Sequence, residues 1–156
     1  MMKDWDKKML HIEFPTGKDR HFFNPEEELK VKKYTYRITK DLALQAADLL
    51  EDHNPWYYGN SPFGEPICNP GIFVNDYLEV IVENGYNGVK GVHYRNNMEL
   101  LYPPRQGHLV TVTVRPLKKY EKRGRIWLEY YMEIVDDEGH IIMRGETTEV
   151  MAKTGE

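Results

Sequence analysis

Long runs of alternating apolar and polar residues in the second half of this chain constrain its fold more than any other feature. In the first run, Val110, Val112 and Val114 share one face, and Thr111 and Thr113 share the other. A period of two residues is typical of a β-strand that buries one of its faces. The turn sequences "KRGR" and "DDEGH" separate the runs. The runs predict antiparallel strands with one buried face, at residues 108–115, 125–135 and 141–151.

The segments before these runs predict two helices and two further strands. Good helix formers with apolar residues at helical spacing predict a helix over residues 40–51, with Thr39 as its N-cap. A second and more apolar helix is predicted to begin at Pro70-Gly71 and to stop at Gly85. The further strands are predicted at residues 30–38 and 91–102. This order predicts an α+β fold, in which a curved antiparallel sheet wraps around a long central helix.

The length of 156 residues fits one domain. Residues 31–156 are predicted to form that domain, whereas residues 1–30 show no sustained period and are interpreted as an N-terminal arm. The beginning of the chain lacks the apolar core of a signal peptide, and no run approaches the roughly 20 apolar residues of a membrane helix. We therefore expect a cytoplasmic protein with no membrane partner.

The charge pattern and the scarcity of metal-binding residues exclude several classes of site. A net charge of −4 disfavours nucleic acid as a partner, and the one basic cluster, "KKYEKRGR" at 118–125, is explained by a solvated hairpin tip. Cys68 is the sole cysteine and the six histidines show no metal-ligand spacing, so no metal site is predicted. No phosphate-binding glycine motif is present, and no cofactor is predicted.

The segment between the two predicted helices combines chemically interesting residues with turn residues. "DHNPWY" at 52–57 reads Asp-x-Asn-Pro-x-aromatic, and "SPFGEPICNPGIF" at 61–73 leads into the second helix. With "PPRQG" at 103–107 before a long strand, these motifs resemble those of the MaoC-like hot-dog dehydratases. The resemblance is greatest to their fatty-acid-synthase-type N-terminal dehydratase branch, and it covers residues 31–151.

The resemblance implies a hot-dog fold and an activity on acyl thioesters of coenzyme A or acyl carrier protein. Members of the family add water to, or remove it from, such thioesters, and they work as dimers or as double hot-dogs of two unlike halves. The reaction needs a base for the water, an acid for the α-carbon and hydrogen-bond donors for the enolate oxygen.

Mapped onto this sequence, the family motif gives Asp52 and Tyr57 as the catalytic pair, with Tyr57 standing where the family has histidine. Neutral tyrosine is a poor base at neutral pH, although it can donate a hydrogen bond. Asn54, Asn69, Gly71 and His93 are the predicted substrate-binding residues. The backbone N–H of Gly71, at the head of the second helix, is the predicted donor to the thioester carbonyl.

Each of these residues also has a plain structural interpretation. Asn69 is a natural helix cap, and Tyr57 is suited to packing or gating. Asp52 falls at the disfavoured C-terminal end of a helix, which slightly favours a functional role. His93 within a strand is more often structural than catalytic, and Cys68 is expected to be a small buried apolar side chain.

Three functions therefore remain open. The first is a hydratase or dehydratase of 2-enoyl thioesters of the (R)-specific type. The second is a non-catalytic, acyl-binding partner of an active hot-dog subunit. The third is an acyl-CoA thioesterase, for which Asp76 and Glu79 on the second helix are the acidic candidates. In every case we expect a homodimer or a hetero-oligomer, because one helix over one sheet leaves the substrate slot to be completed by another hot-dog.

Overall fold

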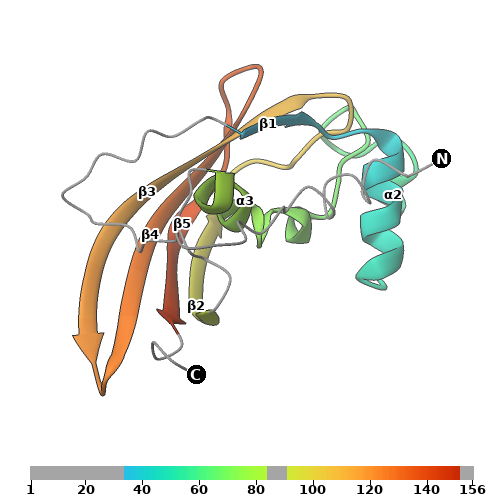
Figure 1. The fold of residues 1–156 in the computed structure, drawn as a ribbon. Coiled ribbons are helices and arrows are strands. Elements are labelled where there is room, and N and C mark those ends of the chain that lie inside the picture. Colours follow the sequence, from blue (N-terminus) through green and yellow to red (C-terminus); the bar gives the residue numbers. More distant parts are fainter. Residues whose placement is uncertain (1–33, 84–90, 152–156) are drawn as a thin grey trace.

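The computed structural model describes residues 34–83 and 91–151, and the expected N-terminal arm and the helix stop at Gly85 lie outside them. One antiparallel sheet dominates this part of the chain (Figure 1). Its strands follow the order β1-β3-β4-β5-β2, so β1 and β2 are the edges among the described strands. They are β1 (Tyr34–Arg37), β2 (Gly91–Leu100), β3 (Leu109–Lys122), β4 (Arg125–Asp136) and β5 (Ile141–Met151). The predicted sheet is confirmed.

The apolar residues of the alternating runs are buried, and the polar residues between them are more exposed. Val110, Val112 and Val114 are fully buried, whereas their neighbours in β3 are not. The same pattern in β4 buries Leu128, Tyr130, Met132 and Ile134. These side chains share one face of the sheet and form the main core, because partners in an antiparallel register point the same way.

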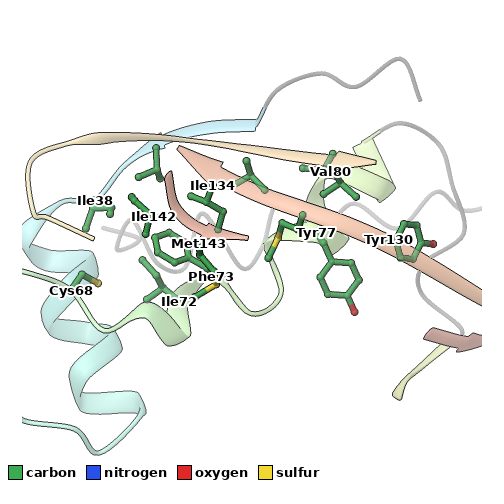
Figure 2. Packing of buried hydrophobic residues seen from close by; sticks show 14 of the residues in the cluster. Ile38, Cys68, Ile72, Phe73, Tyr77, Val80, Tyr130, Ile134, Ile142 and Met143 are labelled. Atoms are coloured by element: carbon green, nitrogen blue, oxygen red, sulfur yellow. The ribbon is translucent and has the colours of Figure 1, made fainter. Parts of the chain in front are cut away.

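The helices cover that face and one end of the sheet. Helix α3 (Asp76–Glu83) lies along the inner side of the curved strands, and α2 (Lys40–Leu49) lies beyond them (Figure 1). Figure 2 shows the core running from Cys68, near α2, past Phe73 to Tyr77 and Tyr130. The expected small, buried Cys68 is confirmed.

Helix α2 forms where it was predicted. The Thr39 hydroxyl accepts a hydrogen bond from Leu42 N at 3.1 Å, which satisfies one of the free N–H groups of the first turn. Its buried stripe consists of small side chains and one leucine, at Leu42, Ala43, Ala46 and Ala47. Small residues on this face let the helix approach the rest of the domain closely.

The second helix differs from the prediction. It is divided into a 3-10 helix, η2 (Pro70–Phe73), and the α-helix α3, which the structure describes from Asp76. Val74 and Asn75 occupy the division, and both are weak helix formers. The expected single long helix is therefore two pieces, with the apolar side chains Ile72, Phe73 and Tyr77 still buried in one core. None of the helices among the described residues has the length and apolarity needed to cross a membrane.

Candidate functional site

Two short loops bring the predicted motif residues together. After α2, Glu51 adopts a left-handed conformation with φ of 51°, and the chain turns back so that Asp52 N donates to Ala47 O at 3.0 Å. Asn54 then caps a second 3-10 helix, η1 (Pro55–Tyr57), by accepting from Trp56 N at 3.0 Å. Asn54 thus has a structural task, and its role in substrate binding stays a prediction.

Asp52 is the centre of a hydrogen-bonded cluster. Its Oδ2 atom accepts from the Tyr57 hydroxyl at 2.7 Å and from Asn69 Nδ2 at 2.7 Å. The Oδ1 atom of Asn69 in turn accepts from Gly71 N at 2.7 Å. The structure therefore joins Asp52, Tyr57, Asn69 and Gly71, four of the six predicted site residues, although they span two loops.

The Tyr57 hydroxyl is held as a hydrogen-bond donor. The side chain is 5% exposed, and burial together with the hydrogen bond to the Asp52 carboxylate raises the pKa of Tyr57 above its ordinary value. A hydroxyl with a raised pKa stays protonated at neutral pH. Tyr57 therefore cannot replace histidine as a base, and its hydroxyl proton is directed at Asp52 Oδ2.

The carboxylate of Asp52 is only partly occupied. The side chain is half-buried, and within the described part of the chain both of its hydrogen bonds end on Oδ2. The Oδ1 atom accepts neither of them. The cluster therefore holds the Asp52 carboxylate in place through Oδ2 alone.

Gly71 is needed for a steric reason. A Cβ atom at this position would lie 2.9 Å from Asn69 Oδ1 and 2.9 Å from Leu50 Cδ1, which is closer than non-bonded carbon atoms approach. Because glycine has no Cβ, the Asn69 amide oxygen can approach the Gly71 N–H to 2.7 Å. The N–H that was predicted to bind a carbonyl is thus engaged by a side chain in this structure, and a ligand would have to replace Asn69 Oδ1 there. Asn69 caps η2, as the plainer interpretation expected.

One residue that sequence reasoning missed fixes the two loops to each other. Gln106 Nε2 donates to the Tyr57 backbone carbonyl at 2.7 Å and to the Ile67 carbonyl at 2.8 Å. Gln106 belongs to the "PPRQG" motif, so the signal was present in the sequence, but its partners are 49 and 39 residues away. This amide sets the distance between η1 and the segment that precedes η2.

His93 lies away from this cluster. It is an exposed residue of edge strand β2, where its ring packs against Tyr77 at a centroid distance of 5.5 Å. Its register partner Glu149 is buried and accepts from the Tyr77 hydroxyl at 2.7 Å. Burial raises the pKa of Glu149, and the hydrogen bond from Tyr77 opposes this only in part. In Figure 2, Tyr77 and Cys68 lie at different parts of the core. A substrate contact by His93 stays a prediction.

A second charged cluster was not predicted. Arg105 is 8% exposed and donates from one nitrogen to Asp136 at 3.0 Å and to Glu138 at 2.6 Å. His108, Asp136 and Glu138 could offer ligand atoms within 4.8 Å of one another. The Arg105 guanidinium already supplies a positive charge to both carboxylates, so we interpret the cluster as a structural ion-pair network. Sequence spacing offers no sign of this network, because Arg105 lies 31 and 33 residues away from its partners Asp136 and Glu138.

The comparisons with known proteins concern the fold of the chain. No family model and no curated protein matches the sequence. Among solved structures, the (R)-hydratase from A. caviae involved in PHA biosynthesis superposes with a TM-score of 0.67 at 17% identity, over 81% of this chain and 97% of that chain. The chain has the hot-dog fold.

Two further hot-dog structures are similar in shape and distant in sequence. The HadBC (3R-hydroxyacyl-ACP dehydratase) complex from Mycobacterium tuberculosis gives a TM-score of 0.65 at 12% identity, over 77% of this chain and 93% of that chain. The MaoC-like dehydratase from Rhodospirillum rubrum gives 0.62 at 14% identity, over 80% and 90%. At such identities the likeness is one of fold, which confirms the predicted α+β hot-dog architecture.

Proposed function

We propose that this chain acts in the cytoplasm on acyl thioesters of coenzyme A or acyl carrier protein, and that it catalyses the reversible hydration of a 2-enoyl thioester. The observation that carries the proposal is the Asp52 carboxylate, held through Oδ2 by the Tyr57 hydroxyl and the Asn69 amide at 2.7 Å each. The hot-dog fold shared with an (R)-hydratase and with dehydratases supports the same class of reaction.

In this proposal Asp52 is the base and Tyr57 is the acid. A water molecule on Asp52 Oδ1 gives up a proton to the carboxylate while its oxygen bonds to C3 of the enoyl thioester. The electrons of the C2–C3 double bond move to the thioester as an enolate, and C2 then takes the Tyr57 hydroxyl proton. The Asp52 carboxylic acid reprotonates the phenolate, which restores both groups. Dehydration is the same path in reverse.

The enolate oxygen needs a donor, and the Gly71 N–H supplies it. In this structure Asn69 Oδ1 accepts from this N–H at 2.7 Å. The thioester oxygen would take the place of the amide oxygen, while Asn69 Nδ2 keeps its bond to Asp52. A developing negative charge at this point is stabilised by a donor that is already oriented.

Hydration of crotonyl-CoA and of longer enoyl-CoAs by the purified chain tests the proposal. Asp52→Asn is expected to reduce kcat/KM by at least about 10²-fold, and Tyr57→Phe by roughly 10²-fold, since each removes one proton-transfer group. Tyr58→Phe is the matched control, because the Tyr58 hydroxyl bonds to exposed His53 Nδ1 at 2.9 Å and not to Asp52. An inactive wild-type chain, tested alone and with a co-purifying hot-dog partner, would contradict the hydratase proposal.

A second candidate is the acyl-binding half of a hetero-oligomeric hydratase. It is favoured by two observations: the Gly71 N–H already donates to Asn69 Oδ1, and the raised pKa of Tyr57 keeps its hydroxyl from acting as a base. A dehydratase that takes the form of a complex has a precedent in HadBC. Full activity of a reconstituted complex that carries Asp52→Asn would support this candidate, whereas a dead complex would favour the enzyme.

The thioesterase alternative has less support. Asp76 is 1% exposed and accepts from the Tyr36 hydroxyl at 2.7 Å, so it serves packing between β1 and α3. The Glu79 side chain lies outside the described residues. Release of free thiol from acyl-CoA, measured in the same preparations, would support the thioesterase alternative.

We also propose that the chain works as a homodimer or with a different hot-dog subunit. Among the described strands β2 is an edge of ten residues, and its Leu100 side chain is 50% exposed. Long exposed apolar edges are normally covered in native proteins. The mass of the purified particle, with identification of any second chain in it, tests this expectation.

A further inference from the structure

The basic hairpin between β3 and β4 forms one side of a pocket. The pocket has a volume of about 530 Å³, and its apolar lining includes Val92 of β2 and Val150 of β5. Lys122, Arg123 and Arg125 line its wall, and no carboxylate is among the described residues that do so. The volume lies within the usual range of small-molecule sites. The basic cluster at 118–125 was expected to be only a solvated hairpin tip. Three of its cations instead line a concave, positively charged surface.

Two aromatic rings complete the wall. Trp127 and Tyr94 pack edge to face with centroids 4.8 Å apart, and the Trp127 Nε1 atom donates to the Lys122 carbonyl at 3.2 Å. The register shift between His93 and Arg95 places Tyr94 in a β-bulge, a device that re-aims a side chain. The Tyr94 ring is 64% exposed and offers a face on which a planar ligand can stack.

The turn at the tip holds a residue that its backbone does not favour. Lys122 and Arg125 are register partners, so the hairpin has a two-residue loop, in which Arg123 and Gly124 have φ of 54° and 68°. Positive φ at both positions is the signature of a type I′ turn, which favours Asn-Gly. Arginine at the first position is strained, and strained positions often carry function. The charge of Arg123 is thus present at a place where asparagine would suit the fold better.

We propose that this pocket binds a purine nucleoside diphosphate, with the base stacked on the exposed face of Tyr94 and the phosphates held by Arg123 and Arg125. Planar guanidinium groups match phosphate geometry, and aromatic rings bind bases through their faces. The pocket lies on the face of the sheet opposite the core, because Trp127 alternates with buried Leu128 in β4. It is therefore separate from the Asp52 cluster and independent of the proposed hydratase reaction.

Calorimetric titration of the full chain with ADP, adenosine and pyrophosphate tests the proposal. ADP is expected to bind saturably, and adenosine and pyrophosphate each at least about tenfold more weakly, because each lacks half of the recognised chemistry. Raising the salt concentration should weaken ADP binding, since exposed charges are screened. Coenzyme A also contains an adenosine diphosphate unit, so the ratio of the ADP and coenzyme A affinities shows whether the pocket prefers a free nucleotide or a carrier.

Arg123→Asn separates binding from folding. The substitution suits the type I′ turn, so the melting temperature should stay equal or rise, while ADP affinity falls about tenfold because one guanidinium no longer binds the phosphates. Lys119→Asn is the matched control, because Lys119 is an exposed cation of the same hairpin that does not line the pocket. Undiminished affinity in Arg123→Asn, an equal loss in Lys119→Asn, or no saturable ADP binding by the wild-type chain would each overturn the proposal.

Discussion

The hydrogen bond between Tyr57 and Asp52 makes a prediction about stability that is independent of catalysis. Tyr57→Phe removes only the hydroxyl, which donates to Asp52 Oδ2 at 2.7 Å, and keeps a ring in a position that is 5% exposed. No cavity of consequence is created. The change in the free energy of unfolding therefore reports the loss of one hydrogen bond to a carboxylate.

Its magnitude follows from the partners that the carboxylate keeps. A hydrogen bond to a charged group contributes about 1.5–3 kcal/mol when its loss leaves a partner unsatisfied. Asp52 is half-buried and retains the Asn69 amide at 2.7 Å, so water and Asn69 compensate in part. We expect a loss of about 1 kcal/mol, which corresponds to roughly 2–4 °C in melting temperature for a domain of this size.

Urea denaturation and thermal melting of the wild type and of Tyr57→Phe measure this loss. Tyr58→Phe is the control, since Tyr58 is 49% exposed and its hydroxyl meets an exposed histidine. Its loss should be close to zero, because exposed partners exchange for water. Combination with Asp52→Asn closes a double-mutant cycle, in which the two sites should couple. Equal stability of Tyr57→Phe and the wild type would refute the view that this bond holds the site together.

Three other substitutions test packing and charge. Gly145→Ala should destabilise the domain by about 1–3 kcal/mol or more, because a Cβ there would lie 2.1 Å from a backbone oxygen of β2. Gly71→Ala should cost less, since one of its two obstacles is an exposed leucine, and Gly59→Ala, with nothing within 4 Å, is the control for both. Glu149→Gln tests the pH dependence. Because burial raises the pKa of Glu149 in the folded state, its favourable contribution is present below the unfolded pKa and is lost as the pH rises through the folded one. The melting temperature of Glu149→Gln relative to the wild type should therefore rise from acidic to alkaline pH.

The sheet could be predicted because its signal is local. The predicted run 141–151 has the same limits as β5, and the run 125–135 differs from β4 by one residue. The run 108–115 was too short, because β3 continues to Lys122 through residues whose charges hide the alternation. The motif around Asp52 was predictable too, since Asp-x-Asn-Pro is compact in sequence.

The contacts that give the site its chemistry were not predictable, because they are distant in sequence. Asn69 reaches Asp52 across 17 residues, and Gln106 reaches the Tyr57 carbonyl across 49. Such pairs depend on how the loops dock against the sheet, for which propensity and periodicity carry no signal. The break at Val74 and Asn75 was missed for a related reason: the apolar spacing continues through it, although η2 ends at Phe73 and α3 begins at Asp76.

The place of β2 in the sheet has a consequence for how the chain folds. β2 (Gly91–Leu100) pairs with β5 (Ile141–Met151), and β3 and β4 both come between them in sequence. Closing so long a loop is slow, so β2 is expected to join the sheet late, after the β3–β4–β5 meander exists. During synthesis β2 leaves the ribosome well before its partner strand. Until residue 151 has emerged, its exposed Val92, Tyr94 and Leu100 form an unprotected edge, and this interval is when the nascent chain is most open to aggregation.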